Sequence, residues 1–275
     1  MTLKVYADRF SQPCRAILIF CKINGIDFEE ITIEVLKLQQ FTPEYKEINP
    51  MSEVPAIVDG GFKLFESHAI LIYLACTNPG VADHWYPADI FKRTKIHSLL
   101  DWHHSHLRRG ASNSNNINRF LDVDFENDYL NDFILVAGLV YNTILAPLYG
   151  LPSNPRAVDE AKKILPKSLS ILDDFWLQGS GQFLLGNSEP SIADLSLVCE
   201  IMQLEFLSEK DYLRILSPYK KVLQWIKDTK NATAPYFDEI HMTLFNAQKG
   251  IREHMLTQSV SSPEGGRKSE VYSEM

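Results

Sequence analysis

Two kinds of residue pattern divide this sequence and predict an α/β N-terminal domain followed by an all-α C-terminal domain. Over residues 1–77, short apolar strands alternate with helices, and a glycine-containing turn joins the last two strands. Over residues 89–250, apolar residues recur only at the spacing of helices. Residues 78–88 contain several prolines and glycines, which predicts a linker between the two domains.

The N-terminal domain is expected to contain a sheet and two main helices. Asp59-Gly60-Gly61 lies between two apolar runs and predicts a hairpin turn. Ser67 precedes an apolar helical run and is the expected N-cap of the second helix. This order of elements is typical of a thioredoxin-like domain. The predicted strands are 3–6, 28–33, 54–58 and 62–65, and the predicted helices are 13–23 and 68–75, with short helical turns over 34–48.

The start of the first helix is the stretch around which this domain is organised. Pro13 suits the first turn of a helix, because its missing N–H would be unpaired there and its φ is already helical. Ser11 therefore lies at a helix N-terminus, where unpaired N–H groups and the helix dipole favour an anion. A bound thiolate is one candidate for that anion. The alternative is that Ser11 only caps the helix.

Pro55 stands at the start of a predicted core strand, where proline is unusual because it cannot donate a hydrogen bond to the ladder. One interpretation is a cis peptide bond, which leaves the backbone of Val54 available to pair with something else. The other is an ordinary trans proline that initiates a strand, since only about 5–6% of X–Pro bonds are cis. The sequence leaves both interpretations open.

Helical periodicity predicts the C-terminal domain and also shows where it is interrupted. Ser191 and Asp194 form an S-x-x-D capping box at the start of the most apolar helix, which we expect to be central. Residues 112–136 begin with a run rich in Asn and Asp, and are expected to be an insert, either a loop that covers the site or an unspliced segment. Residues 251–275 are expected to be a disordered tail. The predicted helices are 93–107, 157–177, 192–207, 219–229 and 237–249.

Composition excludes several classes of partner. The net charge of -8, the pI of about 5.5 and the lack of a basic stripe argue against nucleic acid. No apolar stretch reaches membrane-spanning length, and no signal peptide is recognisable, so no membrane partner is expected. The cysteine usage predicts a reducing compartment and no structural zinc or other metal site, since no C-x-x-C spacing occurs. The cysteines are Cys14, Cys21, Cys76 and Cys199.

Several motifs in a fixed order resemble the glutathione S-transferase family. S-Q-P-C-R-A follows the first strand, V-P-A-I-V-D-G covers the third, and L-F-E-S-H-A-I-L-I-Y-L opens the second main helix. D-H-W-Y-P, W-H-x-x-x-L-R-R and P-S-I-A-D-L extend the similarity over residues 2–250, apart from the insert. The closest resemblance is to the theta class, as found in plants, with a catalytic serine. It implies the glutathione transferase fold.

The resemblance implies how glutathione is held. Ser11 would hydrogen-bond the sulfur of bound glutathione and favour the thiolate, which is the nucleophile. Glu66 would pair with the ammonium of the γ-glutamyl end, and Ser67 would bind its carboxylate. Val54 would pair with the cysteinyl backbone like an added strand, and Gln40 matches the region that reaches the glycyl end. The implied glutathione-binding residues are Ser11, Gln12, Gln40, Phe41, Glu53, Val54, Glu66 and Ser67.

Arg108 and Glu53 are two further positions that the resemblance singles out. Arg108 matches an arginine that in this class approaches the bound sulfur, and a guanidinium there lowers the pKa of the thiol. The neighbouring Arg109 allows this assignment to shift by one residue. Glu53 replaces a lysine that usually precedes the V-P pair. A glutamate does not attract the carboxylate of the tripeptide, so we expect weaker glutathione binding than in a typical member.

The resemblance implies a serine-type enzyme that uses glutathione as a co-substrate and needs no cofactor. Its second substrate would be a hydrophobic electrophile or an organic hydroperoxide. It would be a homodimer in the cytosol rather than in the peroxisome or nucleus. The alternative is a non-catalytic protein of the same fold that binds ligands or partners. A dithiol reductase is disfavoured, because Ser11 occupies the position of the attacking cysteine and Cys14 alone cannot form the disulfide of that motif.

Overall fold

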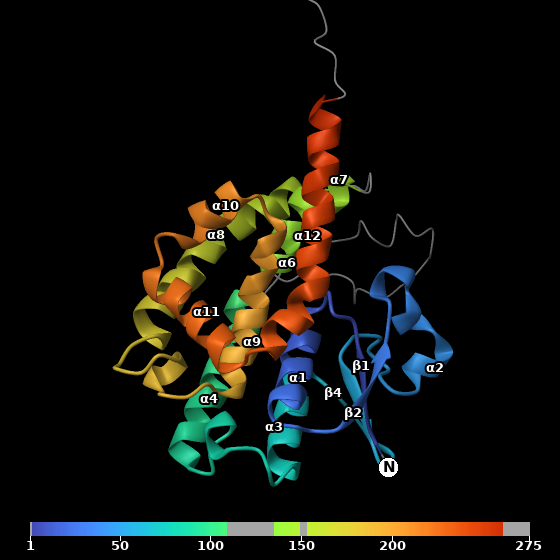
Figure 1. Ribbon diagram of the computed structural model, residues 1–275, viewed down its shortest axis with the longest axis vertical. Coiled ribbons are helices and arrows are strands. Elements are labelled where there is room, and N and C mark those ends of the chain that lie inside the picture. The colour runs from blue at the N-terminus through green and yellow to red at the C-terminus, as the bar shows by residue number, and fades with distance from the viewer. Residues whose placement is uncertain (1, 109–134, 149–152, 261–275) are drawn as a thin grey trace, which may run out of the picture.

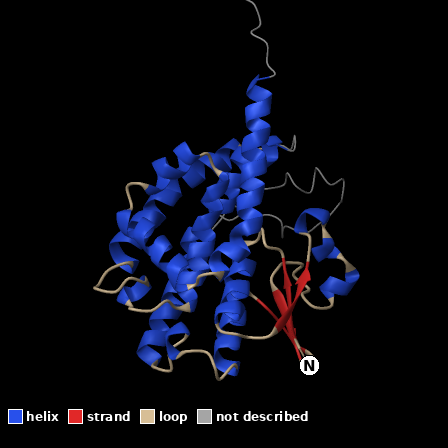
Figure 2. Ribbon diagram, in the orientation of Figure 1, coloured by secondary structure: helices blue, strands red, loops and turns tan. Residues whose placement is uncertain are grey.

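The computed structural model describes residues 2–108, 135–148 and 153–260, and shows an α/β part packed against a larger helical part (Figure 1). The strands form one four-stranded sheet, and the other regular elements of the described residues are helices and helical turns (Figure 2). This architecture confirms the fold class predicted from the sequence. The exact domain boundaries stay predictions.

The sheet has the strand order β2-β1-β3-β4 and mixes parallel with antiparallel pairs. β1 (Leu3–Ala7) pairs in parallel with β2 (Phe28–Thr32) and antiparallel with β3 (Ala56–Asp59). β3 pairs antiparallel with β4 (Phe62–Phe65) across the predicted hairpin. The four predicted strands are confirmed. β3 begins later than predicted, because Pro55 has no N–H to donate to the ladder.

Two proline bonds in the described residues are cis. The bond between Val54 and Pro55 is one of them, so the cis interpretation of the V-P pair is confirmed. The other joins Ala234 to Pro235, between the last two helices, and no sequence pattern had indicated it.

α1 (Gln12–Ile23) and α3 (Ser67–Thr77) lie between the sheet and the helical part (Figure 1). The prediction that Ser67 caps α3 is wrong by one residue. Glu66 occupies the N-cap position and makes no side-chain cap hydrogen bond, while Ser67 is the first helical residue. Glu66 has a φ of 71°, which is not a helical value, so the helix begins at Ser67. A sequence pattern does not indicate a positive φ at a glutamate. On the other side of the sheet lie the short helices η1 (Val35–Lys37), η2 (Gln39–Phe41) and α2 (Pro43–Lys46).

The helical part follows the predicted pattern with breaks into π- and 3-10-helical turns. The elements in chain order are η3 (Asp83–Trp85), α4 (Ile90–Trp102), η4 (His103–Leu107), α6 (Leu135–Val140), η6 (Tyr141–Leu145), α7 (Ala146–Leu148), α8 (Pro155–Ile171), η7 (Leu172–Trp176), η8 (Leu184–Gly186), α9 (Ile192–Ile201), η9 (Met202–Phe206), α10 (Glu209–Leu216), α11 (Lys220–Ala232) and α12 (Tyr236–Val260).

Three expectations about this part need correction or lie out of reach. α10 was not predicted, because its eight residues are too few for a convincing periodicity. The expected disordered tail, 251–275, is wrong for residues 251–260, which continue α12, and Ile251 is buried against the core. Residues 261–275 lie outside the described residues. Of the expected insert, 112–134 also lies outside them, and residues 135–136 belong to α6.

α9 is the centre of the helical part, as predicted, and every one of its residues is buried. The capping box is confirmed: Ser191 accepts a hydrogen bond from the N–H of Ala193, and Asp194 accepts one from the N–H of Ser191 at 2.8 Å. α9 packs directly against α1, so it lies next to the helix that begins at Ser11 (Figure 1). Within the described parts of the chain, the search for a helix that is both long and apolar enough to cross a membrane found none.

Candidate functional site

The sheet register brings three of the predicted segments to one edge. Ala56 lies opposite Tyr6 on β1 and opposite Phe65 on β4. The chain therefore leaves β1, enters β3 and leaves β4 at the same edge of the sheet. The predicted residues that lie next to this edge along the chain are Ser11, Val54, Glu66 and Ser67.

Ser11 is the N-cap residue of α1, but its hydroxyl makes no cap hydrogen bond to the backbone of that helix. It lies near the thiol of Cys14, one turn further on, where it acts to lower the pKa of that thiol. Burial raises the pKa of Cys14 to about 12, so this cysteine is a neutral thiol. The half-buried Ser11 hydroxyl thus lies at a helix N-terminus without the capping duty that was its alternative role.

Asp8 fixes the turn that presents Ser11. Its carbonyl accepts the N–H of Ser11 at 2.9 Å. One carboxylate oxygen accepts the N–H of Phe10 at 2.9 Å, and the other accepts the N–H of Val35 at 3.1 Å. Three backbone donors from two segments therefore converge on one residue, and they hold the loop against the chain that follows β2.

Arg15 holds the same loop from the other side. Its side chain is fully buried, and Nη1 donates to the carbonyls of Arg9 at 3.0 Å and Phe10 at 2.8 Å. Nη2 donates to the carbonyl of Cys199 at 3.0 Å and to Oε1 of Gln203 at 2.9 Å, both in the helical part. Arg15 therefore ties the backbone just before Ser11 to α9 and η9.

Val54 and Glu53 lie on a segment that is held by its backbone. The carbonyl of Glu53 accepts hydrogen bonds from the Tyr45 hydroxyl at 2.6 Å and from Nδ2 of Asn49 at 2.8 Å. The Glu53 side chain is exposed and Val54 is half-buried. With the cis bond that follows, these contacts fix the backbone that precedes β3, which is what a strand-like pairing with an extended ligand requires.

Glu66 and Ser67 lie at the start of α3. Glu66 is exposed, and its positive φ is strained for a residue with a Cβ, by about 1–3 kcal/mol. Its carbonyl accepts the N–H of Ile70 at 2.9 Å, so the helix starts directly after the strained residue. The first N–H groups of α3 therefore face the same sheet edge as the start of α1, and both helix starts favour an anion.

Gln12, Gln40 and Phe41 were also predicted to contact the ligand. Gln12 and Gln40 are both 4% exposed. Nε2 of Gln12 and Oε1 of Gln40 have no hydrogen-bond partner among the described residues. Such buried polar atoms normally have one, but both atoms are closed off from solvent here, so a ligand would reach them only after the side chains rearrange. The ring of Phe41 lies 5.9 Å from the ammonium of Lys46.

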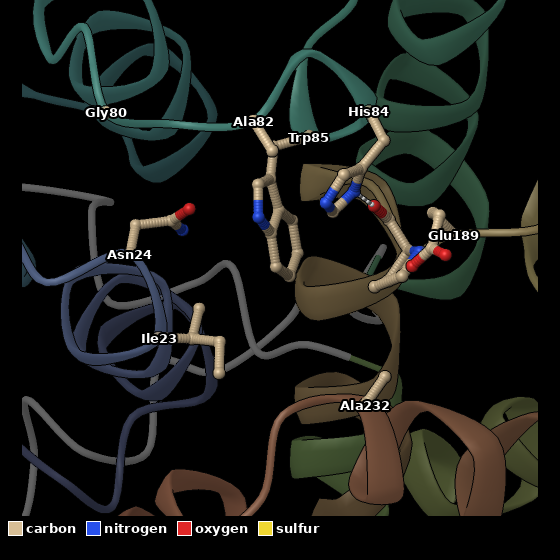
Figure 3. A pocket seen from close by; sticks show the side chains of 9 residues that line it. Ile23, Asn24, Gly80, Ala82, His84, Trp85, Glu189 and Ala232 are labelled. Atoms are coloured by element: carbon tan, nitrogen blue, oxygen red, sulfur yellow. Dashed lines mark hydrogen bonds between the residues drawn. The ribbon is translucent and has the colours of Figure 1, made fainter.

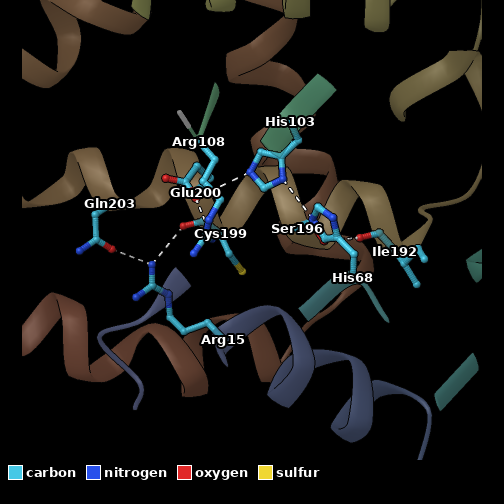
Figure 4. A network of polar contacts seen from close by, with 9 residues as sticks. All are labelled: Arg15, His68, His103, Arg108, Ile192, Ser196, Cys199, Glu200 and Gln203. Carbon is cyan, nitrogen blue, oxygen red and sulfur yellow. Dashed lines mark hydrogen bonds and ion pairs between the residues drawn. The ribbon is translucent and has the colours of Figure 1, made fainter. Parts of the chain in front are cut away.

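Arg108 lies directly after the π-helical η4 and reaches toward α9 (Figure 4). Its side chain is 23% exposed, and Nη1 lies 3.6 Å from Oε2 of the fully buried Glu200. Burial raises the pKa of Glu200 to about 7, and the charge of Arg108 opposes this shift. Arg109, the alternative for the predicted role, lies outside the described residues.

His68 and His103, which lie near Arg108, are neutral packing groups. Nδ1 of His103 lies 3.3 Å from Nε2 of His68, and Nε2 of His103 lies 3.7 Å from Glu200 (Figure 4). Burial lowers the pKa of His68 to about 2 and that of His103 well below its usual range, so the contact with Glu200 is not an ion pair. Among the described residues, no cluster of three or more His, Cys, Asp or Glu side chains is arranged to hold a metal ion.

A separate hollow of about 400 Å³ lies at the other end of α1 (Figure 3). Nδ1 of His84 is hydrogen-bonded to the carbonyl of Pro190 at its wall, at 2.6 Å. Since Ser11 lies at the N-terminus of α1 and this hollow lies at its C-terminus, the hollow is not the predicted site. It is lined by Ile23, Asn24, Gly80, Ala82, His84, Trp85, Glu189, Pro190 and Ala232.

Sequence reasoning did not single out Asp8, Arg15 and Glu200, although they surround the predicted residues. Arg15 and Glu200 carried a signal, because each is a charged residue inside an otherwise apolar helical run. Such residues are almost never fully buried unless they are paired. Asp8 carried a weaker signal, as an aspartate in the loop just before a helix start.

Family models for the N-terminal domain and for a C-terminal domain of glutathione S-transferase match residues 1–76 and 155–228. The chain is 55% identical over 263 residues to glutathione S-transferase T1 of Arabidopsis thaliana, covering 96% of this chain and 97% of that protein. It therefore belongs to the glutathione S-transferase family. It is also 56% identical to glutathione S-transferase T2 of Arabidopsis thaliana, but spans only 40% of the length of that protein.

The similarity extends to the theta class of animals, which confirms the resemblance to that class. Glutathione S-transferase theta-3 of Mus musculus is 35% identical over 203 residues, which cover 74% of this chain and 73% of that protein. Among solved structures, human glutathione transferase theta-2 in complex with glutathione and an unknown ligand is 26% identical, with a TM-score of 0.74. That match covers 95% of this chain and all 100% of the other. The apo form of human glutathione S-transferase T1-1 gives a TM-score of 0.72 at 27% identity, over 94% and 98% of the two chains.

Proposed function

We propose that this protein is a serine-type glutathione transferase that conjugates the glutathione thiolate to hydrophobic electrophiles and also reduces organic hydroperoxides. The observation that supports the proposal is that the segments carrying Ser11, Val54 and Glu66 join the sheet at one edge, while the Ser11 hydroxyl does not cap its helix. Family membership supports it, since the related human theta-2 structure contains glutathione.

In the proposed reaction, the glutathione sulfur loses its proton to solvent and attacks the substrate. With an electrophilic carbon, a sulfur–carbon bond forms and the leaving group departs with its electron pair. With a hydroperoxide, the sulfur attacks the terminal oxygen, an alcohol leaves, and a second glutathione converts the sulfenic acid into glutathione disulfide and water. Both reactions need the thiolate, so a group that lowers the pKa of the bound thiol toward the working pH raises the fraction of the reactive form.

Ser11 and Arg108 are the proposed catalytic residues. The Ser11 hydroxyl would donate a hydrogen bond to the thiolate, and the first turn of α1 would add its dipole. Arg108 would add a positive charge to the same side of the sulfur. Because Arg108 is partly exposed and the residues after it lie outside the described ones, its position beside the sulfur is part of the proposal.

The remaining predicted residues are proposed to hold the tripeptide. Glu66 and Ser67 would bind the γ-glutamyl end, and Val54 would pair with the cysteinyl backbone. Gln12 and Gln40 would turn their unpartnered amide atoms toward the ligand, which would give these buried polar atoms a hydrogen-bond partner. Phe41 and Glu53 would line the glycyl end. A homodimer in the cytosol is proposed from family membership alone.

Ser11→Ala tests the enzyme proposal. We expect kcat/KM for conjugation to fall roughly 100-fold, the usual scale for losing one preorganised donor. Ser208→Ala is the matched control, because Ser208 also stands at a helix N-terminus, but caps α10 through the N–H of Asp211. It should leave activity unchanged. If the folded protein binds glutathione but neither conjugation nor hydroperoxide reduction depends on Ser11, the non-catalytic binding protein is the correct alternative.

Glu53→Lys tests the proposed weakness of glutathione binding. Replacing a negative by a positive charge beside the glycyl carboxylate should lower the Kd for glutathione about tenfold, as expected for exposed charge pairs. Glu209→Lys makes the same change in net charge at an exposed position on α10 and should leave the Kd unchanged. Equal affinities of wild type and Glu53→Lys would rule the idea out.

A further inference from the structure

Glu200 is a buried carboxylate with an unusual environment. Its side chain is 0% exposed, it lies near the C-terminal end of α9, and neither of its oxygens accepts a hydrogen bond from the described residues. Buried carboxylates are normally hydrogen-bonded or paired. The polar groups that approach its Oε2 are Nη1 of Arg108 at 3.6 Å and Nε2 of His103 at 3.7 Å.

The two approaching groups are not equivalent. His103 is neutral because burial depresses its pKa, so it supplies no charge to Glu200. Arg108 is charged and comes from the solvent-facing side, with its guanidinium pointing at the carboxylate (Figure 4). At 3.6 Å without a hydrogen bond, charge attraction alone draws the two groups together. In the low-dielectric interior, such attraction is much stronger than at the surface.

α9 is itself held in a fixed place relative to Ser11. Arg15 donates to the Cys199 carbonyl, one residue before Glu200, and to Oε1 of Gln203, three residues after it (Figure 4). The same guanidinium donates to the carbonyls of Arg9 and Phe10, which precede Ser11. The Glu200 carboxylate therefore has a defined position with respect to the Ser11 loop. A side chain that pairs with Glu200, such as Arg108, is fixed relative to Ser11 as well.

We propose that Glu200 is a positioning residue that holds the Arg108 guanidinium toward the sulfur of glutathione bound at Ser11. The proposal rests on the function proposed above. Arg108 has a long side chain after the end of a helical segment, and it needs a partner to keep one rotamer. Glu200 supplies that partner from α9, so the guanidinium keeps one orientation instead of turning into solvent.

The experiment compares Glu200→Gln in two backgrounds. Glutamine keeps the shape of the side chain and removes its charge. In the wild-type background, we expect kcat for conjugation to fall about tenfold and the pKa of the bound glutathione thiol, read from thiolate absorbance, to rise by about one unit. The KM for glutathione should change less than about threefold, because the charge acts on the sulfur and not on the rest of the tripeptide.

In the Arg108→Ala background, the same Glu200→Gln change should lower kcat less than about twofold, because the group it positions is gone. A purely structural role would give the same loss in both backgrounds. Ser196→Ala is the matched control: Ser196 is buried one turn earlier on α9, and among the described residues its hydroxyl bonds only the Ile192 carbonyl of its own helix. It should leave kcat and the thiol pKa unchanged.

Equal losses in the two backgrounds, or an unchanged thiol pKa in Glu200→Gln, overturn the proposal. If Glu200→Gln does not fold, Glu200→Asp keeps the charge but withdraws it by one methylene, and a partial loss of kcat is then expected. Wild-type kcat and thiol pKa in Glu200→Asp overturn the proposal as well. Failure of the proposed function is distinguishable, since it removes the effect of Ser11→Ala, whereas failure of the Glu200 inference leaves that effect intact.

Discussion

Asp194 and Glu200 are both buried carboxylates on α9, yet they are held in opposite ways. Asp194 accepts hydrogen bonds from the N–H of Leu184 at 2.9 Å and from the indole N–H of Trp225 at 2.8 Å. It also accepts both the N–H and the hydroxyl of Ser191, at 2.8 and 2.9 Å. Both of its oxygens are therefore fully used within the fold.

Glu200 has no hydrogen bond from the described residues, and a charge alone draws Arg108 toward it. Burial raises the pKa of both carboxyl groups, but only at Asp194 do several hydrogen bonds act against the shift. A fully satisfied buried carboxylate supports the fold, whereas an unsatisfied one costs stability. One helix thus carries a folding element at its start and a candidate functional element at its end.

The largest effect is expected at Asp194. Asp194→Asn replaces one of two acceptor oxygens by a donor, which leaves at least two of the surrounding donors without an acceptor. At about 1–3 kcal/mol for each of two unpaired groups, the free energy of unfolding should fall by about 2–6 kcal/mol in urea denaturation. Asp211→Asn, at an exposed cap partner on α10, is the control. A loss below about 1 kcal/mol would contradict this account.

A smaller effect with a distinctive pH dependence is expected at Glu200. Its pKa in the folded protein is about 7, above the ordinary value of 4.5. The native state therefore binds more protons between these two values, and the stability that this group contributes falls as the pH rises through that window. Above pH 7 the full penalty is present, about 3 kcal/mol.

Glu200→Gln removes that penalty. The unfolding free energy of the variant minus that of wild type should therefore be about 2 kcal/mol more positive at pH 8 than at pH 5. Urea denaturation of wild type and variant at both pH values measures this difference. The exposed Glu209→Gln should show no such dependence. An equal effect of Glu200→Gln at the two pH values would mean that Glu200 ionises normally.

The smallest effect separates two serines at helix starts. Ser191 accepts a hydrogen bond from its helix, whereas Ser11 makes no cap hydrogen bond. Ser191→Ala should lower the free energy of unfolding by about 1 kcal/mol, and Ser11→Ala by less than about 0.5 kcal/mol. Thermal or urea unfolding of both variants checks the comparison. A larger loss at Ser11 than at Ser191 would mean that Ser11 caps α1, which is the alternative role considered for it.

The parts of the structure that were predictable depend on local chemistry. The capping box at Ser191, the hairpin at Gly60 and the helix start at Pro13 each need only a few neighbouring residues. The cis bond before Pro55 stayed open, because only the packed strand decides between the isomers. The family motifs predicted the glutathione-binding residues. The register of the sheet brings the segments that carry Ser11, Val54 and Glu66 to one edge.

What was missed depends on contacts between distant segments. Arg15 bonds Gln203, 188 residues away, and no local pattern indicates that pairing. The positive φ of Glu66 moved the start of α3 by one residue, because a strained backbone is imposed by its surroundings. The end of α12 was also misjudged. Ile251 is buried against the core, and the polar residues around it in the sequence do not indicate that contact.

Arg15 has a consequence for how this architecture can be divided. Its guanidinium shares its donors between the loop before its own helix and the helical part of the molecule. If the first 77 residues were joined to a foreign helical domain that buries the same surface, Nη2 would lose both acceptors and become an unpaired buried charge close to the Ser11 loop. A foreign helical domain joined at the linker would therefore have to offer a carbonyl oxygen and an amide oxygen at the positions of the Cys199 carbonyl and Gln203 Oε1. A domain without these two acceptors is expected to give a less stable hybrid.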